Sequence, residues 1–325
     1  MSISTKLLEI KDLIVEFRSV EGIVRAVNKV SLNVHEGEIL GIVGESGAGK
    51  SVTALSIMGL IESPPGKIVS GEINFLGKNL LNCSEKEISL IRGNEISIIF
   101  QEPLTSLNPT HTCGSQVAES LMIHKGLAKK EALKKTIELF KLVGIPLPEK
   151  RVNEYPFQLS GGMRQRVMIV MALICKPKLL IADEPTTFLD VTIQAQIIEL
   201  LKQLQKEIGM AIIMVTHDLA LEFEICNRII IMYAGQVYEE APHEELFTNP
   251  LHPYTIGLLK SIPKITPEKI RLSAINGSVP NPTNLPDGCS FYSRCPRAMD
   301  VCKENKPKLF YVNSRHSVRC WLFKN

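Results

Sequence analysis

The sequence predicts an α/β fold in which buried strands alternate with helices. Three short apolar runs support this prediction, and each ends in glycine or polar residues: Ile39–Val43, Leu179–Ala182 and Ala211–Val215. Runs without a polar face are typical of strands whose two faces are both covered by helices. A chain of 325 residues is long enough for one large domain and a smaller one.

The composition is that of an ordinary globular protein, with 45% hydrophobic and 22% charged residues. The net charge of +3 is too small to indicate a nucleic-acid partner. Met1–Lys6 is polar and no apolar segment of a signal peptide follows it. The longest apolar run, Val167–Cys175, has nine residues and is too short to span a membrane. We therefore expect a cytosolic protein whose eight cysteines are reduced, buried or metal-bound rather than disulfide-linked.

A phosphate-binding loop is predicted between the first apolar run and the helix expected at Val52–Leu60. Residues 44–51 read GESGAGKS and match the pattern G-x-x-x-x-G-K-[ST]. The glycines allow backbone N–H groups to face phosphate oxygens, and the helix N-terminus adds partial positive charge. We expect Lys50 to reach the β- and γ-phosphates and Ser51 to bind Mg²⁺. The predicted nucleotide contacts are Gly44, Ser46, Gly47, Ala48, Gly49, Lys50, Ser51 and Val52.

Two strands are predicted before this loop. Apolar and more polar residues alternate over Leu7–Phe17, which predicts an edge strand, and Val24–Val34 resumes the pattern after a turn at Glu21-Gly22. Phe17 is a candidate for stacking on adenine, and a plain core or edge aromatic is the alternative.

Ser63–Gly66 breaks the chain, and Ile68–Asn74 and Ile96–Phe100 are the next predicted strands. The second of these strands ends at Gln101, in the position where open α/β sheets bind ligands. Its amide is predicted to contact Mg²⁺ or the attacking water, and the alternative is a surface glutamine.

Helical spacing replaces the strand pattern between residues 110 and 158, where Ser115–Met122 and Lys130–Val143 predict a helical insertion. The insertion ends in LSGGMRQ at residues 159–165, which opens another helix. Ser-Gly-Gly at a helix N-terminus is a second candidate anion site. The alternative is structural, with serine as the N-cap and glycine in the turn.

Acidic residues follow the second apolar run and a histidine follows the third. Asp183 suits Mg²⁺ coordination through water, and Glu184 is placed to polarise the attacking water as a general base. His217 is expected to emerge at the same edge and to hydrogen-bond a γ-phosphate.

Taken in order, these motifs resemble the ATP-binding cassette of ABC transporters over residues 6–250. The resemblance rests on the phosphate-binding loop, the Gln101 loop, LSGGMRQ, LLIADEPT at 179–186, Asp190 and His217. It implies a head-to-tail dimer in which each cassette completes the ATP site of the other. The residues that would act in trans are Ser160, Gly161, Gly162 and Asp190. The chain departs from the family at Phe157-Gln158, where His-Glu is commoner, and at Phe188, where alanine is usual.

The implied fold is a P-loop NTPase cassette with a helical subdomain insertion and a small irregular, cysteine-rich C-terminal extension. The predicted domains are 1–109 and 166–250 for the nucleotide-binding core, 110–165 for the helical signature subdomain, and 251–325 for the extension. The segment NPLHPYT at 249–255 resembles the extension of oligopeptide, dipeptide and nickel importers. We expect its prolines and Tyr254 to dock this extension rather than to contact a ligand.

Four of the eight cysteines lie in the last 37 residues: Cys289, Cys295, Cys302 and Cys320. Four thiolates in a small, loop-rich segment are typical of a metal or iron–sulfur centre, whose ligation adds folding energy. The same pattern in peptide-importer cassettes is associated with a [4Fe–4S] cluster. Zinc, including a Cys₃His site with His316, and unligated thiols are the alternatives. Cys175 and Cys226 are predicted core residues.

The resemblance implies an ATPase subunit that powers import of di- and oligopeptides with ATP and Mg²⁺. It would lie on the cytoplasmic side of the membrane, held by two permease subunits and paired with a second cassette, favoured to be a paralogue. An extracytoplasmic peptide-binding protein would act indirectly, and no nucleic acid is expected. A soluble ABC protein of DNA repair or translation is disfavoured because heptads and internal repeats are missing. A redox-sensing degenerate ATPase is disfavoured by the intact Glu184 and His217. The cassette of an exporter or of another importer family is a closer alternative, and only the His252-Pro253-Tyr254 motif separates it from a peptide importer.

Overall fold

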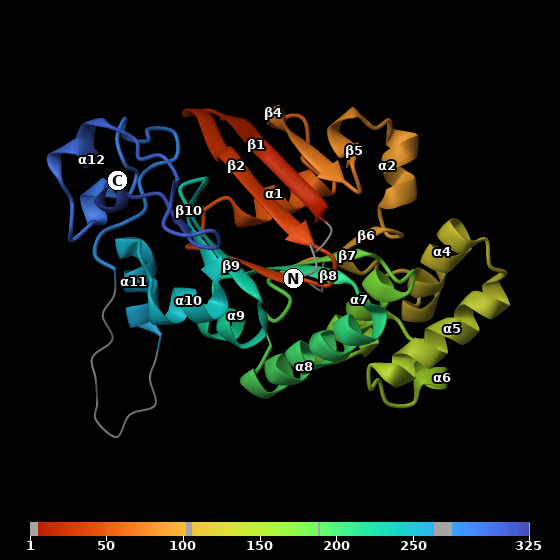
Figure 1. Cartoon of the computed structure of the whole chain (residues 1–325). Coiled ribbons are helices and arrows are strands. Elements are labelled where there is room, and N and C mark those ends of the chain that lie inside the picture. Colours follow the sequence, from red (N-terminus) through yellow and green to blue (C-terminus); the bar gives the residue numbers. More distant parts are fainter. Residues whose placement is uncertain (1–5, 102–105, 188, 263–274, 325) are drawn as a thin grey trace, which may run out of the picture. The chain divides into compact units, whose positions relative to one another are not determined.

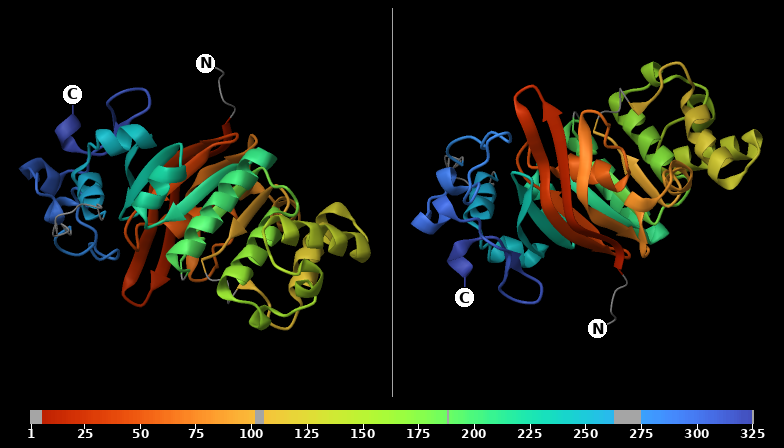
Figure 2. Two further views of the ribbon diagram at one scale, coloured as in Figure 1. Left: turned by 90° about the horizontal axis from the view of Figure 1, so that it is seen from below. Right: turned by 90° about the horizontal axis from the view of Figure 1, so that it is seen from above.

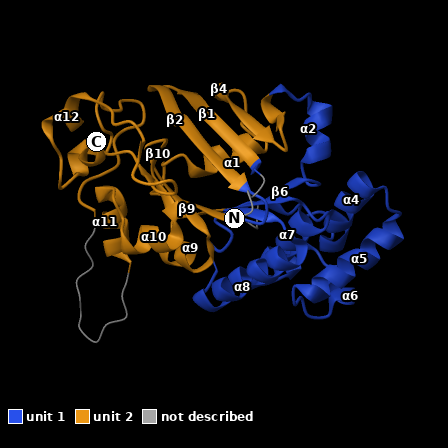
Figure 3. Cartoon of the chain, in the orientation of Figure 1, with its two compact units in different colours: residues 1–7, 35–38, 82–213 blue, residues 8–34, 39–81, 214–325 orange. Residues whose placement is uncertain are grey.

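The computed structural model describes residues 6–101, 106–187, 189–262 and 275–324. The chain divides into two compact units, which Figure 3 shows in different colours. Unit 1 comprises residues 1–7, 35–38 and 82–213, and unit 2 comprises residues 8–34, 39–81 and 214–325. Strand β8 (Ala211–Thr216) has residues in both units. The four-part domain division expected from the sequence stays a prediction.

Unit 1 is rich in helices (Figure 1). Its strands β6 (Ile96–Ile99) and β7 (Leu179–Asp183) pair in parallel, in agreement with the prediction that their apolar runs form strands. The predicted helical insertion forms two helices that pack against each other and end within three residues of the expected positions. The described helices of unit 1 are α2 (Glu85–Ile91), α4 (Cys113–Lys125), α5 (Lys129–Leu142), α6 (Pro148–Arg151), the 3₁₀ helix η2 (Pro156–Gln158), α7 (Gly161–Leu173) and α8 (Val191–Ile208).

Unit 2 contains a four-stranded sheet in the order β2-β1-β4-β5. Its strand β1 lies between two neighbours, so the expectation of an edge strand is wrong. The alternating pattern of β1 reports which face is buried, and it carries no information about the number of hydrogen-bonded neighbours. The strands are β1 (Lys6–Ser19), β2 (Gly22–His35), β4 (Gly66–Phe75) and β5 (Lys78–Asn79), and the 3₁₀ helix η1 (Leu80–Asn82) follows.

A second sheet in unit 2 carries the run β11-β12-β10-β9-β3. Strand β3 (Ile39–Val43) is buried at all five positions and pairs in parallel with β9 (Arg228–Tyr233). Strand β9 forms a hairpin with β10 (Gln236–Pro242) through Ala234-Gly235. The helices of this part are α1 (Lys50–Ile57), α9 (Leu219–Ile225), α10 (His243–Thr248) and α11 (Pro253–Ser261).

The described part of the C-terminal extension, residues 251–262 and 275–324, is built of short elements. Its strand β12 pairs with β10 and thereby extends the sheet of unit 2. In Figures 1 and 2 its blue segments lie beside the cyan helices α10 and α11. Its elements after α11 are the 3₁₀ helix η3 (Tyr292–Arg294), α12 (Asp300–Glu304), β11 (Phe310–Tyr311), β12 (Ser317–Val318) and the 3₁₀ helix η4 (Trp321–Phe323).

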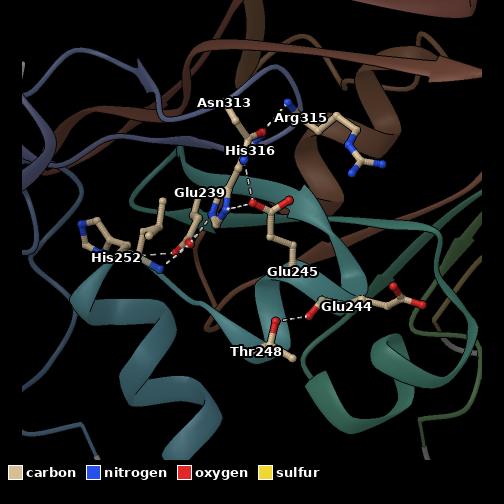
Figure 4. A network of polar contacts seen from close by, with 9 residues as sticks. Glu239, Glu244, Glu245, Thr248, His252, Asn313, Arg315 and His316 are labelled. Atoms are coloured by element: carbon tan, nitrogen blue, oxygen red, sulfur yellow. Dashed lines mark hydrogen bonds and ion pairs between the residues drawn. The ribbon is translucent and has the colours of Figure 1, made fainter.

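A buried ion-pair network fixes the end of this extension (Figure 4). The ring nitrogens of His316 contact two carboxylates, with Nε2 2.8 Å from Glu239 Oε1 and Nδ1 3.1 Å from Glu245 Oε1. The Glu239 carboxylate also accepts the backbone N–H groups of Leu251 and His252, at 2.7 and 2.9 Å. Both His316 nitrogens are engaged by carboxylates in this structure, so it gives no support to the Cys₃His alternative.

Replacing His316 by glutamine should lower the free energy of unfolding by about 1–3 kcal/mol, because it removes hydrogen bonds to charged, buried groups. Burial of the imidazole lowers the pKa of His316, but Glu239 and Glu245 outweigh that effect and the net pKa is raised above 6.5. The stabilisation is therefore full below pH 6.5 and is lost as the pH rises through the folded-state pKa. Urea unfolding at several pH values measures both effects, with His243→Gln as the matched control. Equal losses in the two variants would contradict the network's role.

Candidate nucleotide-binding site

The phosphate-binding loop follows β3 in unit 2, and its glycines are sterically required. Gly47 and Gly49 have φ values of 80° and 97°, in the left-handed region that favours glycine. A Cβ on Gly44 would lie 2.2 Å from the backbone oxygen of Met232. The loop can therefore approach both β9 and a ligand only with this glycine pattern.

The lysine and serine of the motif begin helix α1. The Lys50 side chain folds back over the loop, where its Nζ donates to the backbone oxygens of Gly44 at 2.8 Å and Glu45 at 3.3 Å. Lys50 is buried, with an exposed fraction of 6%. The amine and the first N–H groups of α1 thus lie at one end of the loop, as a phosphate site requires.

The predicted catalytic carboxylate lies in unit 1, directly after β7. Asp183 is the last residue of this buried strand, and Glu184 follows with a φ of 48°. The Glu184 carboxylate accepts hydrogen bonds from Gln101 Nε2 at 2.8 Å and from Thr187 Oγ1 at 2.9 Å. A non-glycine residue in the left-handed region costs about 1–3 kcal/mol, and such strain concentrates at functional sites.

The structure brings Gln101 and Glu184 together, with the amide in contact with the carboxylate itself. Contact of Gln101 with Mg²⁺ or the attacking water stays a prediction. Thr187 was missed, because a threonine after a strand carries no signal of this contact. Buried Gln165 was also missed as a structural link; its Nε2 donates to Pro185 O at 2.6 Å and ties α7 to the loop that holds Glu184.

The LSGGMRQ and Asp190 positions form helix caps in unit 1. Ser160 is the N-cap of α7, where its Oγ accepts the N–H of Met163 at 3.4 Å. Asp190 is the N-cap of α8 and accepts the N–H of Ile193 at 3.0 Å. A Cβ on Gly162 would lie 3.2 Å from Ile193, whereas Gly161 has open space around its Cα. Both cap residues are exposed, and their action on a second cassette stays a prediction. Phe188 lies outside the described residues.

His217 is exposed and follows β8, as predicted. Phe17 is half-buried on β1, opposite Gly66 of β4, where a Cβ on Gly66 would come within 2.7 Å of its ring. A cavity of 320 Å³ lies beside the phosphate-binding loop in unit 2, and Phe17 is not among its lining residues. The lining comes from β2, the phosphate-binding loop, α1, the β9–β10 turn and the C-terminal extension: Val24, Arg25, Ala26, Ser46, Gly47, Gly49, Val52, Ala234, Val279, Pro280, Asn281, Pro282 and Leu285.

The four C-terminal cysteines are free thiols, of which Cys295 is half-buried and the others are buried. Burial raises the pKa of Cys320 to about 11; a backbone hydrogen bond from Leu322 opposes this shift, and Cys289, Cys295 and Cys302 add to it. Within the described ranges, no group of three or more His, Cys, Asp or Glu side chains is placed to hold a metal ion. The structure thus gathers the thiols in one region but gives no support to an iron–sulfur or zinc centre. Cys175 and Cys226 are buried, in agreement with their prediction as core residues.

Comparison with known proteins decides the family. The ABC transporter family matches residues 27–187, and the family "Oligopeptide/dipeptide transporter, C-terminal region" matches residues 238–302. The oligopeptide transport ATP-binding protein AppD of Bacillus subtilis is 52% identical over 318 residues, which are 98% of this chain and 97% of AppD. The chain belongs to the ATP-binding proteins of ABC transporters. The dipeptide transport ATP-binding protein DppD of Haemophilus influenzae is 50% identical, covering 97% of this chain and 94% of DppD.

Solved cassettes share the fold of this ABC ATP-binding protein. The dimeric, post-hydrolysis structure of the cassette MJ0796 with ADP and Pi aligns with a TM-score of 0.66 and 32% identity, over 73% of this chain and 98% of that chain. CbiO1 of Clostridium perfringens, part of the transporter complex cbiONQ, aligns with a TM-score of 0.63 and 30% identity, over 75% and 91%.

Among the helices that the structure describes, none combines the length and apolar character needed to cross a membrane.

Proposed function

We propose that this ABC ATP-binding protein hydrolyses ATP to power the import of di- and oligopeptides through a membrane permease. The observation that carries the proposal is the full-length similarity to oligopeptide and dipeptide transport ATP-binding proteins, which includes the C-terminal region. A carboxylate held by Gln101 and Thr187 next to a buried Asp183 supports an active rather than a degenerate ATPase.

The proposed roles follow the chemistry of each group. Lys50 and the loop amides bind phosphates, Glu184 is the general base and His217 steadies the γ-phosphate. Mg²⁺, when bound, neutralises charge on the β- and γ-phosphates; the residues that would hold it are Ser51, Gln101 and Asp183. Ser160, Gly161, Gly162 and Asp190 act on the ATP of a second cassette, and Phe17 stacks on adenine.

The partners we propose are a paralogous second cassette, two permease subunits on the cytoplasmic side of the membrane, and indirectly an extracytoplasmic peptide-binding protein. Affinity purification of this chain from detergent-solubilised native membranes tests this assembly. Recovery of the second cassette with both permeases is the expected result. Co-purification of ribosomes or DNA, or the recovery of no membrane partner, would contradict the role in a transporter. It would not contradict ATP hydrolysis by this chain.

We also propose that the four C-terminal cysteines bind a [4Fe–4S] cluster. Support comes from their shared region. Burial raises the pKa of Cys289, Cys295 and Cys320, and backbone N–H groups of Phe291, Arg297 and Leu322, which donate to their sulfurs, oppose that rise. Such donors stabilise thiolates, the form in which cysteine binds metals. The thiols would have to close around the cluster from their described positions.

Anaerobically purified protein should accordingly be brown and contain about four irons per chain, as in a Cys₄-ligated cluster. Cys302→Ala should lose the iron and the colour, whereas Cys83→Ala, outside this segment, should keep both. Iron content and the visible absorption spectrum are the measurements. A colourless protein that carries one zinc ion per chain, or no metal, would contradict the proposed [4Fe–4S] cluster.

A further inference from the structure

One ion pair in unit 2 joins the C-terminal extension to the phosphate-binding loop. Arg294 of η3 donates from Nη1 to Glu45 Oε2 at 2.6 Å and from Nη2 to Glu45 Oε1 at 2.9 Å, across 249 positions of sequence. The Arg294 side chain is only 4% exposed. The Glu45 side chain is 28% exposed, so one partner of the pair is buried. Bidentate pairs are stronger and more specific in geometry than single-contact surface ion pairs.

The guanidinium is itself held in place by the extension and by β9. It lies over the rings of Tyr233 and Phe291, 5.7 and 5.8 Å from their centroids, and Nε donates to Asn276 O at 3.1 Å. Arg294 therefore has little freedom to follow the loop. A shift of the extension would move Glu45 with it.

A second contact fixes the backbone of the same loop residue. The N–H of Glu45 donates to Tyr254 Oη at 3.0 Å, and Tyr254 is fully buried on α11. Tyr254 therefore packs the extension onto the rest of unit 2 and also hydrogen-bonds the phosphate-binding loop. The sequence predicted only the first of these two roles. The extension holds Glu45 by its side chain and by its backbone.

Glu45 is positioned to pass this constraint on to the ligand-binding groups. Its backbone oxygen accepts the Lys50 amine at 3.3 Å and the N–H of Ala48 at 3.1 Å. In addition, residues 279–285 of the extension face Ser46 and Gly47 across the cavity beside the loop. The extension therefore contacts the first half of the loop and lines the space next to it.

We infer that Arg294, together with Tyr254, is a positioning residue that holds the phosphate-binding loop in its ATP-binding form, so that the C-terminal extension sets the affinity for ATP. This inference rests on the proposed ATPase function. The residue acts through Glu45 and needs no contact with the nucleotide.

The test compares ATP affinity, KM, kcat and Tm of the full chain carrying Arg294→Gln, Arg294→Lys or Tyr254→Phe. We expect Arg294→Gln to raise the Kd and KM for ATP about tenfold with kcat changed less than about twofold, as for typical coupling between sites. Arg294→Lys should fall between wild type and Arg294→Gln, because lysine keeps the charge without the bidentate geometry. Tyr254→Phe keeps the ring packing and should raise Kd about threefold through loss of one hydrogen bond.

Arg228→Gln is the matched control, because Arg228 also forms a half-buried ion pair in unit 2, with Glu240. It should lower Tm while leaving the Kd for ATP unchanged. A Glu45→Gln/Arg294→Gln double variant should bind ATP no more weakly than Arg294→Gln alone. The inference is overturned if Arg294→Gln and Tyr254→Phe both have the wild-type Kd for ATP. It is also overturned if the rise in Kd in these two variants is no larger than in Arg228→Gln when the loss of Tm is the same. Wild-type protein that binds no ATP would instead overturn the proposed function.

Discussion

Glu184→Gln should lower kcat for ATP hydrolysis by about 10²–10⁴-fold, the usual contribution of a general base, while ATP binding is retained. The glutamine oxygen can still accept hydrogen bonds from Gln101 and Thr187, which contact the carboxylate at 2.8 and 2.9 Å. The amide cannot take a proton from water. The geometry of the site is therefore preserved and only its basicity is lost.

Steady-state phosphate release measures the loss of turnover, and equilibrium ATP binding shows that the site is intact. Glu199→Gln, at an exposed position of α8 in the same unit, is the matched control and should hydrolyse ATP at the wild-type rate. More than about a tenth of wild-type turnover in Glu184→Gln would contradict the general-base role.

Local motifs allowed the sequence to predict the strand, loop and helix around residues 39–57. Short-range patterns mark these elements, and the positive φ values of Gly47 and Gly49 are local constraints of this kind. The close approach of Gly44 to Met232 is a long-range constraint on the same loop. The same local reasoning located Asp183 and Glu184 after a buried strand. The edge position of β1 was predicted wrongly, because strand order depends on partners that alternation in one strand does not report.

Long-range contacts were beyond sequence reasoning for a physical reason. Glu45 and Arg294 are each unremarkable in their local sequence, and only the folded chain brings them within hydrogen-bond distance. His316 was considered as a metal ligand because its sequence neighbours include cysteines, yet Glu239 and Glu245 occupy its ring nitrogens. Partner choice for such side chains is settled by tertiary packing, which a single sequence does not display.

The stability of this protein should fall as the pH rises between about 4.5 and 8, and a single buried carboxyl group is a main cause. Glu222 on α9 is fully buried, and its Oε2 accepts a hydrogen bond from the thiol of Cys226. Its Oε1 finds no hydrogen-bond partner among the described residues. Burial raises the pKa of Glu222 to about 8, and the negative charge of Asp218 adds to the shift.

The direction of this pH dependence follows from proton binding by Glu222. Between pH 4.5 and 8 the folded state holds the Glu222 proton more tightly than the unfolded chain does, so the contribution is full below pH 4.5 and is lost as the pH rises through about 8. The shift corresponds to about 5 kcal/mol across this window. Glu222 is fully buried, and its Oε2 packs against the backbone of Gly41, where an added Cβ would lie only 1.9 Å away.

Glu222→Gln removes the titrating group while keeping the shape of the neutral side chain. Its free energy of unfolding should match wild type near pH 5 and exceed it by about 2–4 kcal/mol at pH 8. Urea unfolding from pH 5 to 8 gives the comparison, and Glu224→Gln, at an exposed position of the same helix, should keep the wild-type pH slope. Parallel pH profiles for wild type and Glu222→Gln would show that this carboxyl group is ionised in the folded protein. The space between β3 and α9 would then have to admit water, because no described side chain is placed to neutralise that charge.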